Sequence, residues 1–404
     1  MGALSGVKVL EFGGMLAGAV TTKHLALMGA EVIKVESSKR MDITRVQHPG
    51  AHAALIDAAP TDTFMTNETN LNKLDVTLNL SDPEGVQLAR RLVAISDVLV
   101  ENFRPSVMER IGLGYQALKE IKPDIVMLSI SMAGGTGSEA HYTGYAPIFS
   151  ALGGVGHLTG YPDGPATEIR FPVDVMVGTT AAFAILAALI YRQQTGEGQH
   201  IDLSAREAAS CLISDSIMDY TMNGRNQSRE GNRDEVMAPH NCYPCMGEDK
   251  WISIAVKTED EWSALCQTMG NPPWARGERF ADGASRWSNQ EILDTYISEW
   301  AAQYTHYELM DLLQKAGVAA VPSFNAEELC SDPHLNERGL LVVVDHTTLG
   351  AQTVFSPPAK LSLTPAEVLS PGPALGQHNH YVFKELLNLS EQEIKDLMER
   401  EVIC

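Results

Sequence analysis

The stretch VKVLEFGGMLAGAVTTKHLALMGAEVIKVE, residues 7–36, decides the fold class. Residues 7–12 form the short apolar run that is typical of a buried strand, and residues 31–36 form another. Between them, residues 17–30 carry apolar side chains at helical spacing. Strand, helix and strand in this order predict a βαβ unit, whose two strands run parallel.

The same alternation continues through the first half of the chain. Further strands are predicted at residues 74–80, 97–102 and 124–131, and the amphipathic helices between them at 82–96 and 114–122. Ser81 is the expected cap of the first of these helices. Short apolar strands that alternate with helices indicate a parallel sheet covered on both faces. The predicted fold class is therefore a doubly wound α/β sheet.

The later sequence predicts a second, smaller domain. After a helix at 205–224 and a polar linker, its expected elements are a hairpin at 242–256 and helices at 258–269, 289–303 and 306–316. We expect a large domain at 1–222, a smaller α+β domain at 223–320, and a C-terminal segment, 321–404, that returns to the large domain.

The net charge argues against several partners. Lys and Arg number 30 against 51 Asp and Glu, a formal charge of −21. Affinity for nucleic acid or for an anionic membrane surface requires a basic face, so we expect neither partner. The uncharged run from Val175 to Tyr191 is shorter than the roughly 20 apolar residues that span a bilayer. It predicts a buried helix.

Cysteine usage bears on compartment and metal binding. The first residues, MGALSGVKVLEF, lack the pattern of a secretory signal, and six cysteines in 404 residues make no disulfide framework. We therefore expect a cytoplasmic protein. His240, Cys242 and Cys245 have ligand-like spacing, but a structural zinc site needs a fourth ligand. We expect no metal site.

Basic residues follow two of the predicted strands. In KVESSKRMDITR four cations lie close together at and after the strand at 31–36, and they form either a solvated loop or a site for the phosphates of a nucleotide: Lys34, Lys39, Arg40 and Arg45. The segment ENFRPSVMERIG follows the strand at 97–102 and supplies an amide, an aromatic ring and two guanidinium groups: Asn102, Phe103, Arg104 and Arg110. An adenine nucleotide needs both a flat apolar surface and cations. The alternative is a helix start with ordinary surface arginines.

Asp174 stands at the head of the long apolar run. Asp is a favoured helix cap, which would be a purely structural role. A helix N-terminus also favours negative charge, so the same carboxylate could remain ionised and act as a nucleophile toward an activated acyl group. Both interpretations remain open on the residues alone.

Other catalytic patterns are absent or weak. The sequence has no G-x-S-x-G elbow, no P-loop and no G-x-G-x-x-G spacing. These absences argue against an α/β-hydrolase, a P-loop NTPase and a dinucleotide-dependent enzyme. Proton transfer by a histidine and an acid is a remaining alternative, since His141 and His157 lie in a Gly-rich region at 134–164.

Taken together, these segments resemble the family III CoA-transferases. The likeness rests on many ordered matches along the chain: LSGVKVLEF, DITR, LNLSDPEG, DVLVENFRP, RIGLGYQAL, LTGYPDGPAT, VGTTAAFAILAALIYRQQTGEGQHIDLS and SDPHLNERG. The resemblance implies a Rossmann-like large domain formed from both chain ends, a smaller domain, and an interlocked dimer.

The resemblance also implies roles for individual residues. Asp174 matches the acyl acceptor, which would form an acyl-aspartyl anhydride and then an aspartyl-CoA thioester. The CoA site would include Met15, Leu16, Ala17, Lys39, Arg40, Asn102, Phe103, Arg104 and Arg110. Gly134 and Gly135 would cover the intermediate and stabilise the oxyanion. No tightly bound cofactor is implied, because CoA arrives as part of the acyl-CoA substrate.

The chain departs from the family pattern at a few positions. Leu16 replaces a glutamine of formyl-CoA transferase, which favours a larger or less polar acid, such as benzylsuccinate, with succinyl-CoA as donor. Ser37 and Ser38 replace two arginines. In the related racemases a His and Asp pair transfers the proton, and here the matching stretch holds Tyr145 and Ala146. We expect an acyl-CoA:carboxylate CoA-transferase; the alternatives are an acyl-CoA racemase or isomerase, and a non-catalytic subunit of a heteromeric transferase.

Overall fold

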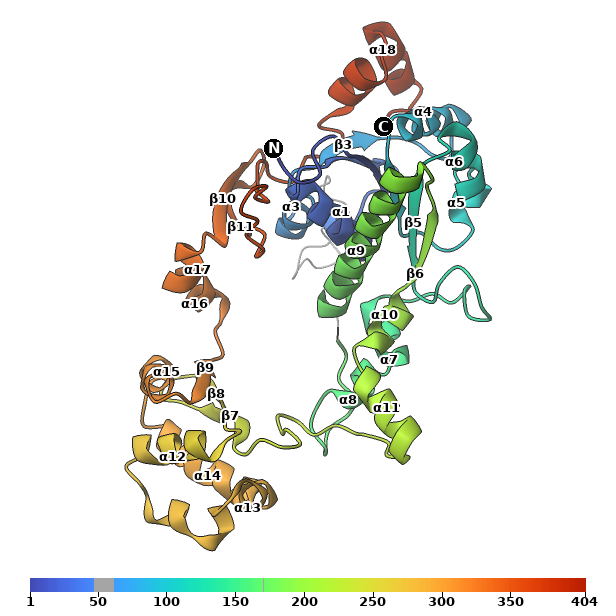
Figure 1. The fold of residues 1–404 in the computed structure, drawn as a ribbon. Coiled ribbons are helices and arrows are strands. Elements are labelled where there is room, and N and C mark those ends of the chain that lie inside the picture. Colours follow the sequence, from blue (N-terminus) through green and yellow to red (C-terminus); the bar gives the residue numbers. More distant parts are fainter. Residues whose placement is uncertain (47–61, 170) are drawn as a thin grey trace. The chain divides into compact units, whose positions relative to one another are not determined.

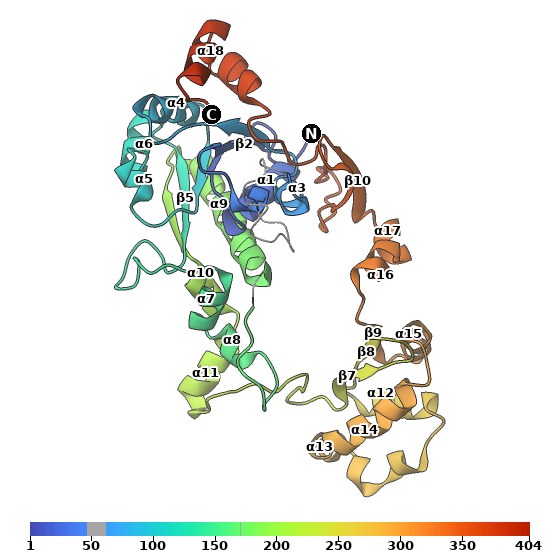
Figure 2. The same ribbon diagram turned by 180° about the vertical axis from the view of Figure 1, so that it is seen from behind.

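A computed structural model describes residues 1–46, 62–169 and 171–404 of the protein. These residues form two compact units, of which Figure 1 and Figure 2 show opposite sides. The first unit contains Met1–Gly156, Glu168–Asn226 and His334–Cys404. The second contains His157–Thr167 and Gln227–Pro333. Both ends of the chain therefore lie in the first unit.

The first unit is built on a six-stranded parallel sheet. Its strands are β1 (Lys8–Phe12), β2 (Glu31–Glu36), β3 (Leu74–Thr77), β4 (Val98–Glu101), β5 (Val126–Ser131) and β6 (His200–Ser204). Their order is β3-β2-β1-β4-β5-β6, and every neighbouring pair is parallel. The doubly wound α/β sheet predicted from the sequence is confirmed.

The strand order reverses between β1 and β4. The chain first moves outward from β1 to β2 and β3, and then returns to the other side of β1 to build β4, β5 and β6. The loops that leave β1 and β4 consequently diverge toward opposite faces at the carboxyl edge of the sheet. Folds of this class bind their ligands at such a switch point.

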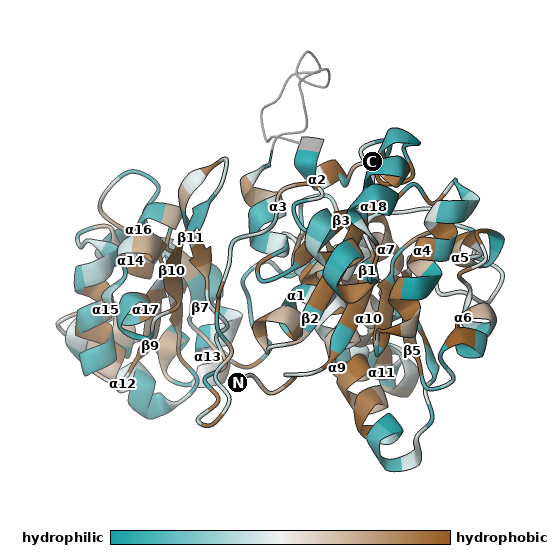
Figure 3. Cartoon of the chain, turned by 90° about the horizontal axis from the view of Figure 1, so that it is seen from above, coloured by the Kyte–Doolittle hydropathy of each residue, from teal (hydrophilic) through white to brown (hydrophobic). Residues whose placement is uncertain are grey.

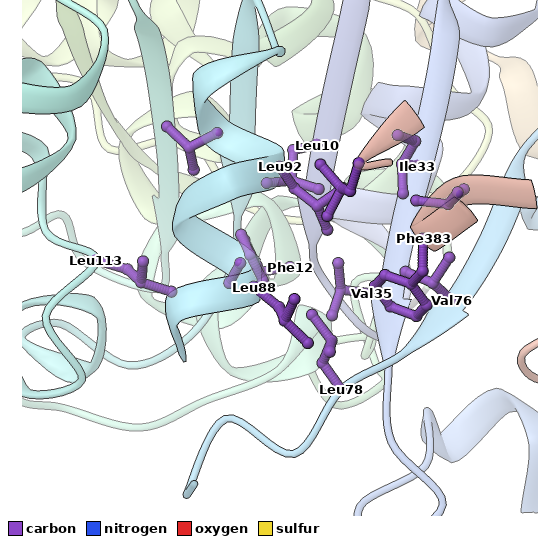
Figure 4. Close-up of a cluster of buried hydrophobic side chains, with 14 of the residues drawn as sticks. Leu10, Phe12, Ile33, Val35, Val76, Leu78, Leu88, Leu92, Leu113 and Phe383 are labelled. Atoms are coloured by element: carbon purple, nitrogen blue, oxygen red, sulfur yellow. The ribbon is translucent and has the colours of Figure 1, made fainter. Parts of the chain in front are cut away.

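One face of the sheet is covered by α4 (Pro83–Ala94), α6 (Tyr115–Ile121), the π-helical turn η4 (Tyr381–Leu386) and α18 (Glu391–Glu399). Figure 4 shows side chains from the strands, α4 and η4 converging: Leu10, Phe12, Ile33, Val35, Val76, Leu88, Leu92 and Phe383. Each fully buried side chain of this size contributes about 1.5–3 kcal/mol. The C-terminal residues thus complete the core of the N-terminal sheet.

The opposite face is covered by α1 (Ala17–Leu27), α7 (Ala146–Leu152), α9 (Phe171–Thr195) and α10 (Ala205–Cys211). Small residues let α1 and α9 approach closely. A side chain at Gly178 would lie 2.8 Å from Val20 Cγ1 and 3.0 Å from the Ala17 carbonyl oxygen. The two helices lie side by side in Figure 1 and Figure 2.

Helix α9 is buried on one side only. Val177, Ala181 and Ile185 lie in the core, whereas Phe183 is 73% exposed and Ile190 is 57% exposed. The helix expected from the sequence is therefore present, but only one of its sides is buried in this chain. Among the described residues, α9 is the one helix whose length and composition would allow it to cross a membrane, and 39% of its most apolar window is buried.

Two local predictions differ from the structure. Helix α4 is capped by Asp82, whose side chain accepts from the Glu84 amide, and not by Ser81. The helix predicted at 205–224 is broken into α10 and α11 (Ser214–Asn223). The Gly-rich region contains α8 (Val155–Leu158) as well as α7.

The remaining elements of the first unit are short. They are α2 (Ile43–Val46), α3 (Phe64–Thr69), α5 (Val107–Arg110) and an antiparallel hairpin of β10 (Leu341–His346) and β11 (Gly350–Phe355). Helix α17 (Pro333–Glu337) begins at the end of the second unit. Figure 3 shows apolar strands at the centre of the first unit and polar colour on its outer helices.

The second unit is an α+β fold. Its antiparallel sheet has the order β7-β8-β9, with β7 at His240–Pro244, β8 at Trp251–Ala255 and β9 at Ala319–Pro322. The predicted hairpin corresponds to β7 and β8. Its helices are α12 (Glu259–Thr268), α13 (Gly283–Ser288), α14 (Gln290–Ala301), α15 (His306–Lys315) and α16 (Ala326–Ser331), with 3₁₀ turns at Pro273–Arg276 and Glu278–Phe280.

Candidate active site

The loop after β1 is fixed by the first residue after β4. The Asn102 side chain accepts from the Gly14 amide at 3.1 Å and donates to the carbonyl oxygens of Gly14, at 2.7 Å, and Met15, at 3.1 Å. Both amide hydrogens of Asn102 are therefore used within the protein. The structure assigns Asn102 to holding this loop, whereas the sequence suggested that it contacts CoA.

Glycine makes this arrangement possible. A side-chain carbon at Gly18 would lie 3.2 Å from the Asn102 side chain, and one at Gly13 would lie 3.1 Å from its oxygen. The glycines of EFGGMLAG thus make room for Asn102, and nothing in their spacing is that of a dinucleotide fold. Leu16 and Ala17, which follow at the start of α1, are both buried. Leu16 is the residue before α1, and no side chain caps this helix.

Asp174 lies in the first turn of α9, which begins at Phe171. It is one helical turn before Gly178, on the same side of the helix. Because Gly178 is seated against Ala17 and Val20, Asp174 is carried toward the N-terminus of α1. Met15, Leu16 and Ala17 lie where the chain passes from β1 into α1, and Asp174 lies on the side of α9 that packs against α1.

The Asp174 carboxylate is partly buried and has no partner among the residues that the structure describes. Burial raises its pKa to about 6. The structure does not support the helix-cap role, because the residue sits within the first turn and accepts no backbone hydrogen bond there. At pH 7 about nine in ten such groups are ionised, so a nucleophilic carboxylate is available.

The two arginines after β4 are exposed. Among described residues, neither Arg104 nor Arg110 has an ion-pair partner, so both guanidinium groups are free to bind an anion. Phe103 is half-buried and packs against the first core cluster. The amide of Phe103 donates to Glu101 at 2.7 Å, and burial raises the pKa of that carboxyl to about 7.

The loop after β2 is tied to the C-terminus. Lys39 forms an exposed ion pair with Glu401 at 2.7 Å, and the Ser38 amide donates to the carbonyl oxygen of Cys404 at 2.9 Å. Arg40 is exposed and has no partner in the described part of the chain. Of the two predicted phosphate-binding residues here, only Arg40 is unpaired.

The Gly-rich loop after β5 turns at Gly134, whose φ of +86° suits glycine. The Gly135 amide donates to both oxygens of Asp202, at 2.9 and 3.0 Å. That amide is thus already bound, and it is not a free donor for an oxyanion in this arrangement. The predicted role of Gly134 and Gly135 remains a prediction for another conformation of the loop.

Four buried charges lie beneath the β1 loop, and of these only Lys34 was predicted as a site residue. The prediction that Lys34 and Arg45 bind phosphate is wrong, because both side chains are buried and paired with acids. Glu11 accepts from Lys34 at 3.1 Å and from Lys73 at 2.9 Å, and Lys34 also pairs with Asp42 at 3.1 Å. Desolvation would lower the pKa of Lys34, but Glu11 and Asp42 outweigh it and raise that pKa above its usual value. Charged residues inside the apolar strands VKVLEF and EVIKVE were the sequence signal for this cluster.

No metal site is evident in the described residues, since no three His, Cys, Asp or Glu side chains gather to hold an ion. Cys242 has a thiol 3.8 Å from the Ser323 hydroxyl, and Cys245 is buried. The groups described above are therefore a carboxylate without a partner in the described residues, an uncapped helix N-terminus, and exposed arginines after β2 and β4.

Comparison with known proteins places this arrangement in a family. Residues 4–379 match CoA-transferase family III. The chain is 36% identical, over 99% of its length and 98% of the relative, to succinyl-CoA–D-citramalate CoA-transferase of Chloroflexus aurantiacus. It is 33% identical to succinate–glutarate CoA-transferase of Agrobacterium fabrum, over 95% of each chain.

Solved structures agree with the sequence comparison. A CAIB/BAIF family protein from Brucella suis superposes with a TM-score of 0.86 at 31% identity, over 95% of this chain and 99% of that chain. A hypothetical protein from Mycobacterium tuberculosis gives a TM-score of 0.77 at 27% identity, over 94% and 99%. The match covers sheet, switch point and second unit alike. This protein belongs to the family III CoA-transferases.

Proposed function

We propose that the protein transfers CoA from succinyl-CoA to a carboxylic acid, with Asp174 as the nucleophile. The observation that supports the proposal is the partly buried Asp174 carboxylate, which has no partner in the described residues and sits in the first turn of α9, on the side that packs against α1. Succinyl-CoA is chosen as donor because the names of several relatives specify it.

The first half of the reaction loads CoA onto the enzyme. An Asp174 oxygen attacks the thioester carbonyl carbon, the new C–O bond replaces the C–S bond, and CoA leaves as a thiolate. The thiolate then attacks the Asp174 carbonyl carbon of the mixed anhydride. Succinate leaves, and an aspartyl-CoA thioester remains. No electron or proton is left over, so the steps require no metal or redox cofactor.

The second half reverses these steps with a new acid. The acceptor carboxylate attacks the aspartyl thioester carbonyl carbon and forms a second anhydride, with release of the thiolate. The thiolate attacks the acceptor's acyl carbon, which yields the new acyl-CoA and returns the Asp174 carboxylate. Each attack develops negative charge on a carbonyl oxygen, and the amides at the uncapped start of α1 are the donors proposed to stabilise it.

The CoA moiety needs cations outside the reacting centre. Arg104, Arg110 and Arg40 are exposed and unpaired among described residues. Arg40 follows β2, and the other two arginines follow β4, so they come after the strands on either side of β1. Guanidinium groups bind phosphate through paired hydrogen bonds. We propose that they hold the nucleotide, with Phe103 beneath them. Lys39 would join them only by leaving Glu401.

For the acceptor, we propose a small dicarboxylate. Relatives named for citramalate, malate, glutarate and mesaconate all pair such an acid with a succinyl group. The apolar Leu16 suggested an aromatic or branched acid such as benzylsuccinate. Benzylsuccinate is itself a dicarboxylate, so it can be tested in the same panel of acceptor acids as the small dicarboxylates. The acid that accepts CoA fastest then shows whether the site prefers a small acceptor or an aromatic or branched one.

The test is covalent trapping. Wild-type protein is mixed with succinyl-CoA and quenched with hydroxylamine, which should convert Asp174 to its hydroxamate and add a defined mass to its peptide. Asp174→Asn should show no adduct and no exchange but should still bind CoA. Asp215→Asn, an exposed acid in the first turn of α11, serves as the matched control. A label on any other residue, or exchange by Asp174→Asn, would refute the proposal.

The same protein sample addresses the remaining alternatives. An acyl-CoA racemase or isomerase would incorporate solvent deuterium at the α-carbon without any acceptor acid, which we do not expect. We propose a homodimer or a heteromer with a homologous subunit, because relatives at 32% identity are named as alpha and beta subunits. Native mass measurement distinguishes these two assemblies, and an inactive homomer would indicate a heteromeric enzyme.

A further inference from the structure

The loop that leads into α1 is held by the two ends of one buried ion pair. Lys34 donates to the Gly13 carbonyl oxygen at 2.7 Å, and Asp42 accepts from the Met15 amide, with both oxygens at 3.2 Å. Lys34 and Asp42 are themselves paired at 3.1 Å, and both side chains are almost wholly inaccessible to solvent. The cation therefore holds one end of the loop, and the anion holds the other.

Met15 needs such support. Its φ is +40°, in the left-handed region that side chains other than glycine rarely adopt. A residue persists there only where the surroundings fix it on several sides. Asp42 takes its amide, and Asn102 takes its carbonyl oxygen. The residue after Met15 is Leu16, which immediately precedes α1.

Asp42 cannot readily move to another position. One oxygen also accepts from the Thr44 amide at 3.0 Å, and the Asp42 amide donates to Glu36 at 3.2 Å. Lys34 uses its three hydrogens on Gly13, Glu11 and Asp42. Since every donor of the ammonium is used, the pair acts as a rigid support for the backbone above it.

We propose that Asp42 is a positioning residue for the transferase reaction: by holding Met15 in its left-handed conformation, it directs the free amides of α1 toward Asp174. This inference rests on the proposed function, because it assigns a purpose to the geometry around that nucleophile. Asp42 itself does not touch substrate. It acts through Met15 and the start of α1.

The first test needs no substrate. Hydrogen exchange of a peptide that covers Gly13–Leu16 is compared between wild type, Asp42→Ala and Asp42→Asn. Loss of the acceptor should speed exchange of the Met15 amide by at least about tenfold in Asp42→Ala. Asp42→Asn keeps one acceptor oxygen, so it should change the exchange rate of the Met15 amide less than Asp42→Ala does. If exchange at Gly13–Leu16 is unchanged in Asp42→Ala, the inference is overturned, whether or not Asp174 is the nucleophile.

A matched control shows that the effect is local. Asp75 is another buried carboxylate on the neighbouring strand β3, where it pairs with Arg45 and accepts from the Gly376 amide. It makes no contact with the β1 loop. Asp75→Asn should leave exchange at Gly13–Leu16 as it is in wild type. If Asp75→Asn speeds that exchange equally, general loosening explains the result and the inference fails.

The second test separates positioning from folding. In single-turnover trapping with saturating succinyl-CoA, the amplitude counts competent sites and the rate constant reports their geometry. In the Asp42 variants, displacement of α1 should lower the rate constant for formation of the Asp174 adduct about 10- to 100-fold, while the amplitude is retained. A reduced amplitude with an unchanged rate constant would mean a structural role only. If the wild-type protein forms no Asp174 adduct, the proposed function fails. The hydrogen-exchange experiment then still shows whether Asp42 holds the Met15 backbone.

A double variant tests the mechanism of the effect. Met15→Gly removes the side chain that disfavours positive φ. In the Asp42→Asn background, this change should restore the rate constant at least threefold, because the loop then needs less support. If Met15→Gly and Asp42→Asn lower the rate independently, the two residues are uncoupled, and holding Met15 is not what Asp42 does.

Discussion

The Asp174 carboxylate should reduce the stability of the fold that holds it. Its pKa rises from an ordinary 3.8 to about 6 because burial disfavours the charged form. An acid with a higher pKa in the folded chain binds more protons when folded, so stability falls as the pH rises through that interval. The penalty is small below pH 3.8 and complete above about pH 6. At 1.36 kcal/mol for each pKa unit, it amounts to about 3 kcal/mol.

Asp174→Asn removes the charge at nearly constant volume and should therefore stabilise the first unit. We expect a gain of up to about 3 kcal/mol at pH 7.5 and of less than about 1 kcal/mol at pH 4, where the carboxylate of wild type is protonated in the folded chain. The pH dependence of the gain identifies its cause, because repacking alone would be independent of pH.

The assay must observe the first unit. All five tryptophans belong to the second unit, in the range 227–333, so their fluorescence reports on that unit alone. Native-state hydrogen exchange of peptides from α9 and β4 measures the opening free energy of the first unit directly. Tryptophan fluorescence through a denaturation series then serves as an internal reference that should not change.

Asp215→Asn provides the opposite expectation. Asp215 lies in the first turn of α11 but is exposed, so its charge interacts favourably with the helix dipole. Its removal should destabilise slightly, by about 0.3–1 kcal/mol. The reasoning about Asp174 would be refuted by a variant no more stable than wild type at pH 7.5, or by a gain that persists unchanged at pH 4.

Three further predictions concern packing and capping. Gly178→Ala should destabilise the first unit by about 1–2 kcal/mol and slow Asp174 acylation, because the new carbon meets the Ala17 carbonyl oxygen at 3.0 Å. Hydrogen exchange of α9 measures the loss of stability, and the trapping rate measures acylation. A variant more stable than wild type would contradict this prediction. Arg45→Met should cost about 3–5 kcal/mol, because it leaves Glu36, Asp62 and Asp75 without their buried cation, and denaturation monitored by circular dichroism should show the loss. Thr305→Ala removes half of the capping box of α15 and should lower the fluorescence-detected stability of the second unit by about 1 kcal/mol, with the first unit unaffected.

Local patterns predicted much of the fold. The βαβ run at the start of the chain, the strands that follow it and the β7–β8 hairpin were all read from apolar spacing and turn residues. These elements are predictable because side-chain periodicity records which face of an element is buried. Helix ends were less reliable, as the cap of α4 shows: Asp82, and not Ser81, accepts the free amide.

The candidate site was predictable only in part. Asp174 could be singled out as a lone acid before an apolar helix, and the structure adds that its carboxylate is partly buried without a partner in the described residues. Asn102 was also singled out, but its amide turns inward to the β1 loop. Chain order does not state which polar atoms a side chain will meet, so a residue that supports a loop looks like one that binds a ligand.

The sequence by itself determined the class of sheet, the family and the identity of the nucleophilic candidate, because each depends on residue order or local spacing. Only the tertiary structure decided that Lys34 and Asp42 support the Met15 backbone, and that the C-terminal segment expected to return to the large domain does so from His334 onward. Both features join positions far apart in the sequence, from 21 residues between Gly13 and Lys34 to 328 between Arg45 and Pro373. Such contacts form when the sheet brings the ends of its strands to one edge, and periodicity along the chain carries no record of them.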